Sequence, residues 1–198
     1  MSARKNIAIF LFDGVEELDA AGPWEVLAYW ARNYPEDGFD VFTFADSLDP
    51  ITCAKGLRIL PDLRSSELPA LEVLIYPGGQ GTRPALLRAD HLAWVREQRT
   101  HVPLMASVCT GALVYAAAGI LRNRPATTHW ASVDRLSELD PTITVRPDDR
   151  FVEDGDTITS AGVSAGIDMA LRLVERFSNR ERARQVRRGI QYDPEPPV

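Results

Sequence analysis

The chain has 198 residues, of which 45% are hydrophobic and 25% charged, a composition typical of a globular protein with one α/β core. Its formal charge of −6 argues against a nucleic-acid-binding surface, which needs clustered lysine and arginine, and no stretch approaches the roughly 20 apolar residues that span a bilayer. The two cysteines, Cys53 and Cys109, provide no disulfide framework and suit a reducing compartment, so we expect one cytoplasmic domain over residues 1–198.

The first predicted elements are a strand and a helix with acidic residues between them. Residues 7–12 form a continuous apolar run, which is typical of a central strand covered on both faces. A helix is predicted next, with Pro23 at an early helical position. Glu16, Glu17 and Asp19 follow the strand where open α/β sheets bind ligands. Acids near a helix start also complement its dipole, so position alone leaves both interpretations open.

Three more strand signals follow along the chain. Residues 40–45 alternate as a strand does, and residues 57–60 suggest a short edge strand or one arm of a hairpin. The apolar strand at residues 71–76 ends in Pro-Gly-Gly-Gln-Gly-Thr at residues 77–82. Consecutive glycines allow close approach of a ligand and offer N–H groups to an oxyanion. The segment lacks the Lys-Ser/Thr of a phosphate-binding loop, and a plain tight turn is the alternative.

The segment around Cys109 has the steric form of a nucleophile elbow. The apolar run 102–108 predicts a buried strand, and a small-residue segment with helical spacing follows Cys109 directly. Ser107 and Gly111, two positions before and after the cysteine, are small, as a strained strand-to-helix turn requires. A thiol at a helix N-terminus is expected to favour the thiolate. The alternative is a buried structural cysteine, whereas the coincidence of signals predicts a nucleophile.

The part of the chain that follows the Cys109 segment contains one further candidate site residue. His129 has small, polar and aromatic neighbours, although a lone histidine is more often structural than catalytic. Residues 151–160 predict a hairpin, and a helix with a strong apolar stripe starts near residue 165. A charged helix is expected over residues 179–191, and an extended Pro-rich tail over 192–198.

Several ordered motifs together resemble the ThiJ/PfpI superfamily, relatives of the class I glutamine amidotransferases, and are most similar to its isonitrile hydratase branch. The resemblance covers nearly the whole chain and implies a flavodoxin-like α/β three-layer sandwich with a mostly parallel central sheet. It also implies a homodimer without a metal or an organic cofactor, acting on a small-molecule substrate. The motifs that carry it are FDGVEELD (12–19), GP (22–23), YPGG (76–79), SVCTG (107–111), ATTHW (126–130) and AGID (165–168).

The resemblance also implies roles for single residues. Cys109 is the expected nucleophile, Asp19 its acidic partner, and Thr110 the residue that assists at the substrate. Gly79 corresponds to a backbone donor beside the thiol. A peptidase or glutaminase-like triad requires a histidine directly after the cysteine. Thr110 occupies that position, which argues against peptidase activity. His129 keeps a more distant Cys-His arrangement open.

The expected activity is hydration of an isonitrile to an N-substituted formamide through a thioimidate on Cys109. One alternative is glyoxalase-like action of the same thiol on small aldehydes. Another is a ligand sensor like the sensing half of AraC-type regulators, although no helix-turn-helix segment follows within these residues. A redox sensor that oxidises Cys109 is a further alternative. Trp24, Thr82 and Trp130 are candidates to line the pocket.

Overall fold

The computed structural model describes residues 4–194, and the end of the predicted Pro-rich tail, residues 195–198, lies outside this range. A seven-stranded sheet forms the centre, and all neighbouring strands in it are parallel except for the antiparallel edge pair β10–β11. Its strands in spatial order are β10 (Phe151–Asp154), β11 (Thr157–Ser160), β7 (Leu104–Val108), β6 (Val73–Tyr76), β1 (Lys5–Phe10), β2 (Phe39–Ala45) and β5 (Leu63–Arg64).

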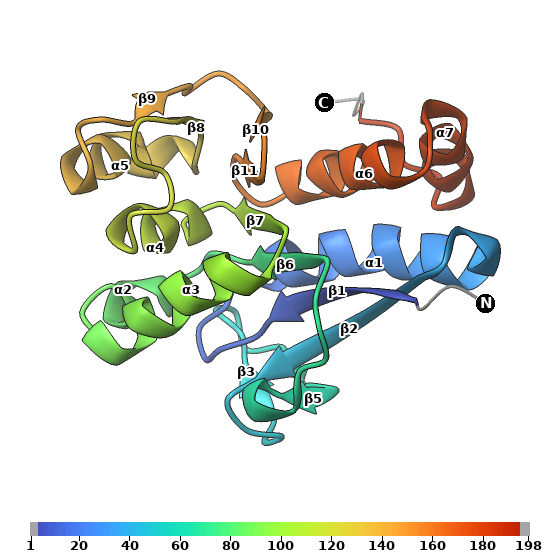
Figure 1. Ribbon diagram of the computed structural model, residues 1–198, viewed down its shortest axis with the longest axis horizontal. Coiled ribbons are helices and arrows are strands. Elements are labelled where there is room, and N and C mark those ends of the chain that lie inside the picture. Colours follow the sequence, from blue (N-terminus) through green and yellow to red (C-terminus); the bar gives the residue numbers. More distant parts are fainter. Residues whose placement is uncertain (1–3, 195–198) are drawn as a thin grey trace.

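Helices cover both faces of this sheet and complete the three-layer architecture (Figure 1). One face carries α1 (Glu17–Asn33), α6 (Ala165–Phe177) and α7 (Arg180–Gly189). The other carries α2 (Thr82–Ala85), α3 (Ala89–His101), α4 (Gly111–Ala117) and α5 (Val133–Leu139). No helix within residues 4–194 is long and apolar enough to cross a membrane.

Smaller elements connect the main ones. Strands β3 (Ile51–Thr52) and β4 (Arg58–Ile59) form an antiparallel hairpin, and β8 (Pro125–Ala126) pairs in parallel with β9 (Thr144–Val145). Short 3₁₀ helices span Pro35–Asp37, Ser65–Glu67 and Trp130–Ser132. The hairpin β3–β4 confirms the short strand predicted at 57–60.

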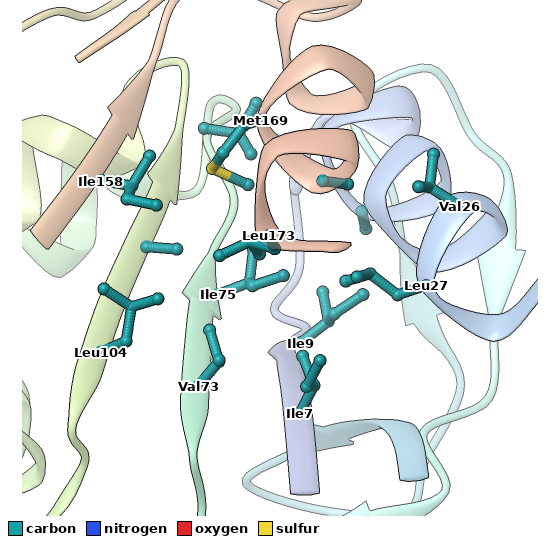
Figure 2. Close-up of a cluster of buried hydrophobic side chains, with 14 of the residues drawn as sticks. Ile7, Ile9, Val26, Leu27, Val73, Ile75, Leu104, Ile158, Met169 and Leu173 are labelled. Atoms are coloured by element: carbon teal, nitrogen blue, oxygen red, sulfur yellow. The ribbon is translucent and has the colours of Figure 1, made fainter. Parts of the chain in front are cut away.

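The central strands are buried on both faces, which explains their continuous apolar sequences. Side chains alternate across a strand, so Ile7 and Ile9 of β1 join the cluster beneath α1 and α6, whereas Ala8 and Phe10 join the cluster on the opposite face. Figure 2 shows the first cluster, where Leu173 of α6 lies among the strand residues. The two clusters hold the strand ends in place from both sides.

Loops that follow the parallel strands meet at the carboxyl edge of the sheet. The Glu16 N–H donates to the Gly78 carbonyl at 2.9 Å and joins the loops after β1 and β6. The Cys109 N–H donates to the Ser160 carbonyl at 3.0 Å and joins the turn after β7 to the end of β11. The predicted glycine segment and the predicted elbow therefore lie together, as expected for parallel strands.

Most elements predicted from the sequence are confirmed, and Pro23 is the exception. It lies in the second turn of α1 and not at an early position. Because proline has no N–H, the carbonyl of Asp19, four residues earlier, receives no helical hydrogen bond. The early position predicted for Pro23 is wrong because the helix begins at Glu17, six residues before the proline.

Gly111 offers a test of the packing that fixes the elbow. A Cβ atom at this position would collide with the Tyr76 carbonyl oxygen and lie 2.9 Å from the Pro77 oxygen. We expect Gly111→Ala to lower the free energy of unfolding by about 3 kcal/mol, because rigid backbone atoms would have to move. Gly119→Ala is the control, since Gly119 has φ +78° but open space around it, and should cost about 1 kcal/mol. Equal losses in urea unfolding would contradict this account.

Candidate active site

Cys109 lies on the turn between β7 and α4 in a strained backbone conformation. Its φ is +56°, which side chains other than glycine rarely adopt. Its N–H donates to the carbonyls of Ser160 at 3.0 Å and Ala161 at 3.2 Å, so the last residue of β11 and the residue after it hold the turn. The small residue at Gly111 is needed because the Tyr76 carbonyl lies against it. The strained strand-to-helix turn predicted at Cys109 is thus present in the structure.

Asp19 is the acid that faces this thiol. It lies in the first turn of α1 and is completely buried. Its Oδ2 accepts a hydrogen bond from the Gly78 N–H at 2.9 Å, while Oδ1 has no hydrogen-bond partner among the described residues. Burial, and then the charge of Glu16, raise the pKa of Asp19 to about 7, against the opposing effects of Gly78 and the Cys109 thiol. The carboxyl is therefore poised to gain or lose a proton at neutral pH.

The Cys109 thiol is only 6% exposed, and its pKa is raised to about 12. Burial is the main cause, and the negative charge of Asp19 adds to it; the N–H groups of Thr110 and Val163 act in the opposite direction. The N–H at the start of the helix favours the thiolate, as expected, but burial outweighs its effect on the pKa of Cys109. The two buried groups interact, so the thiol can ionise readily only when Asp19 holds a proton.

Thr110 sits in a hydrogen-bond network next to the thiol. Its Oγ1 accepts the Gly79 N–H at 2.9 Å, and Thr82 Oγ1 lies 3.1 Å from it. Thr82 Oγ1 also donates to the Gly79 carbonyl at 2.8 Å. The Gly79 N–H, which was expected to be a donor beside the thiol, is thus engaged by the Thr110 hydroxyl in this structure.

His129 is held beside Cys109 by its neighbours. The Thr128 hydroxyl donates to the Cys109 carbonyl at 2.8 Å, and His129 Nδ1 accepts the Ala131 N–H at 3.2 Å. A neutral ring with an accepting Nδ1 carries its proton on Nε2, so His129 is a donor in that form. No hydrogen bond within residues 4–194 joins His129 to Cys109, although both line one pocket.

That pocket has a volume of about 350 Å³, near the lower end for small-ligand sites. It contains Cys109, Thr110, Gly79 and His129, whereas Asp19 lies beneath it. The residues that line it are Glu16, Ala54, Lys55, Gly79, Gln80, Arg83, Cys109, Thr110, His129, Ala131, Ser132 and Val163.

The three residues that were predicted to line the pocket, Trp24, Thr82 and Trp130, do not line it. Trp24 lines a separate groove on the outside of α1, and Trp130 is 79% exposed and does not line this pocket. Thr82 is buried and does not line the pocket; its hydroxyl lies within hydrogen-bond distance of the Thr110 hydroxyl. Lys55 and Val163 were missed. Val163 has φ +51°, an unusual value for a β-branched residue that no sequence pattern indicates.

Two other sequence features have structural roles. Cys53 is buried in the turn between β3 and β4, and burial, followed by nearby acidic charges, raises its pKa. His91 lies on α3 and is within 2.7 Å of the Tyr76 hydroxyl in the core. No cluster of three or more histidine, cysteine or acidic side chains suited to a metal occurs among the described residues.

A family model, curated relatives and a solved structure are all similar to this chain. The model of the DJ-1/PfpI family matches residues 5–176. An isonitrile hydratase from Pseudomonas putida is 38% identical over 97% of this chain and 80% of its own length. The crystal structure of a ThiJ/PfpI family protein from Pseudomonas syringae superposes with a TM-score of 0.87 and 33% identity, over 99% of this chain and 78% of that one. The HTH-type transcriptional regulator GbdR from Pseudomonas aeruginosa is 30% identical over 66% of this chain and 35% of its own length.

The raised pKa of Asp19 makes stability depend on pH. Its ordinary value is 3.8, so between about pH 4 and pH 7 the folded protein holds a proton that the unfolded chain has lost, and stability falls as the pH rises. Asp19→Asn removes this cost. We expect the variant to be more stable than the wild type by about 1–4 kcal/mol at pH 8, and much less so at pH 4, in urea unfolding. Glu25→Gln, an exposed acid on the same helix, is the control. Parallel stability curves for wild type and Asp19→Asn would refute the coupling.

Proposed function

The chain belongs to the DJ-1/PfpI family, and from this premise we propose that it is a cofactor-independent cysteine enzyme that hydrates an isonitrile to an N-substituted formamide. The observation that carries the proposal is the buried pair of the Cys109 thiol and the Asp19 carboxyl, whose pKa of about 7 suits proton transfer in both directions. The 38% identical isonitrile hydratase supports the choice of reaction.

In the first step the Cys109 sulfur attacks the terminal carbon of the isonitrile. Asp19, ionised at the start, accepts the thiol proton as the carbon–sulfur bond forms, and then delivers it to that carbon. The product is a thioimidate in which the former isonitrile carbon bears one hydrogen and the sulfur. Because the proton passes from sulfur to carbon through one neighbouring group, no exposed thiolate needs to accumulate.

In the second step water adds to the thioimidate carbon. Asp19 accepts a proton from this water and passes it to the substrate nitrogen, which gives a neutral tetrahedral adduct. The adduct collapses to the formamide, and the carbon–sulfur bond breaks with its electron pair on sulfur. The hydroxyl proton returns to the pair, so Cys109 and Asp19 end as they began.

The residues around the thiol have roles in this scheme. The Thr110 hydroxyl, now engaged with the Gly79 N–H, turns to the substrate nitrogen as charge develops there and leaves the Gly79 N–H available to the adduct. His129 lines the pocket and is suited to orient the water or the substituent on nitrogen. Thr82 supports the network from the buried side.

The test is formation of formamide by the pure protein from a panel of aliphatic and aromatic isonitriles. We expect turnover by the wild type, loss of at least about 1,000-fold in kcat for Cys109→Ser, and a strong loss for Asp19→Asn, because both act in bond making and proton transfer. No turnover across the panel would overturn the proposed reaction.

The pH dependence provides a second prediction. The reactive form of the pair holds one proton, and it is populated between the pKa of Asp19, about 7, and that of Cys109, about 12. The value of kcat/KM should therefore rise with pH through an inflection near 7. A flat profile between pH 5.5 and 8.5, measured on a substrate without ionisable groups, would contradict the role of Asp19.

A ligand-sensing function is the second candidate, and the match to the regulator GbdR supports it. In that case the pocket binds a small molecule without turnover. Retention of a ligand with no product, in the wild type and in Cys109→Ser alike, would favour sensing. Lactate formed from methylglyoxal would instead indicate a glyoxalase-like reaction. The homodimer implied by the family resemblance stays a prediction, which sedimentation analysis tests.

A further inference from the structure

Of the two cationic side chains that line the Cys109 pocket, Lys55 and Arg83, only Lys55 has an ion-pair partner among the described residues. Lys55 forms an ion pair with Glu16, and its ammonium also lies 3.6 Å from Glu17. Arg83 lines the same pocket, yet its guanidinium makes no ion pair or hydrogen bond with any residue in the range 4–194. The pocket therefore contains one cation, Arg83, that has no ion-pair partner within the part of the chain that the structure describes.

The backbone of Arg83 is firmly placed beside the reactive loop. Its N–H donates to the Gln80 carbonyl at 3.1 Å, and the preceding Thr82 is buried and bonded to Gly79 and Thr110. Arg83 thus starts from a fixed point next to the residues that surround the thiol, while its side chain is exposed at the pocket mouth. A guanidinium held in this way matches the two oxygens of a carboxylate.

The direction of the substrate follows from the chemistry. The terminal isonitrile carbon must reach the buried Cys109 sulfur, so the substituent on nitrogen extends away from the thiol toward the mouth. Arg83 and the Gln80 amide both line the pocket and can donate to a group at that end. Lys55 is less suited to this role because Glu16 and Glu17 already neutralise it.

We propose that Arg83 is a specificity-determining residue that binds a carboxylate on the nitrogen substituent, so that the substrates are anionic isonitriles. The proposal rests on the isonitrile hydratase function proposed above and names its substrate class. It predicts that two substrates of equal shape are distinguished by charge alone.

The experiment compares 4-isocyanobenzoate with 4-isocyanobenzamide, and 3-isocyanopropanoate with 3-isocyanopropanamide. Within each pair the shape is nearly the same and only the acid is charged at neutral pH. We expect wild type to prefer at least one of the two acids over its amide in kcat/KM by about tenfold, the effect of one charge-assisted contact at a partly exposed site. Arg83→Gln should abolish this preference mainly through KM and leave the amides almost unchanged. Arg96→Gln, an exposed arginine on α3 that does not line this pocket, is the matched control and should keep the preference.

A preference that is absent in the wild type, or that survives in Arg83→Gln, would overturn the proposal while leaving the hydratase function intact. If no isonitrile is turned over, the proposed function fails instead. Binding then tests Arg83 independently: calorimetry should give tighter binding of 4-formamidobenzoate than of 4-formamidobenzamide to wild type, and equal binding of both to Arg83→Gln. Equal binding of both compounds to wild type would contradict the role of Arg83.

Discussion

The proposed chemistry depends on one buried interaction, in which the Cys109 thiol and the Asp19 carboxyl would share a proton. Neither group is favourable as an ion in this environment, since burial raises the pKa of both. Two negative charges so close together are disfavoured further, so the pair keeps at least one proton over the physiological range. A buried thiol that would be inert alone thereby gains a neighbouring base. This interaction links the structure to every version of the proposed chemistry.

The fold maintains this pair at a cost in strain and desolvation. Cys109 has a positive φ, and two carbonyls at the end of β11 hold its N–H, while Asp19 keeps one oxygen without a hydrogen-bond partner among the described residues. Such features persist only where the surrounding structure over-determines them. Here the parallel strands β1, β6 and β7 bring their loops to one edge, and the helices on both faces hold the strands. Backbone strain at Cys109 and burial of Asp19 destabilise the fold locally, and the packing of the sheet between its helices offsets this loss of stability.

The sequence predicted the sheet and the strained turn at Cys109, because apolar strand runs and small residues around the cysteine are local signals, whereas it implied Asp19 as the partner of Cys109 only through the family resemblance. It did not predict the state of the thiol, since burial outweighs the helix terminus only when tertiary packing is known. It also missed Val163, whose N–H lies near the sulfur through an unusual backbone angle, and Arg83, which a short helix brings to the pocket mouth. Trp130, an aromatic residue next to His129, was predicted to line the pocket, but it is exposed and lies outside the pocket lining.

The most direct test of the shared proton is a titration followed by NMR, with ¹³C at the Cβ atoms of the two cysteines. Cys53→Ala assigns the Cys109 signal. The account predicts that this signal shows an inflection near pH 7, where Asp19 ionises beside it, and that Asp19→Asn abolishes the inflection and moves the onset of thiolate formation to lower pH. A Cys109 signal that titrates identically in the wild type and in Asp19→Asn would contradict the central claim.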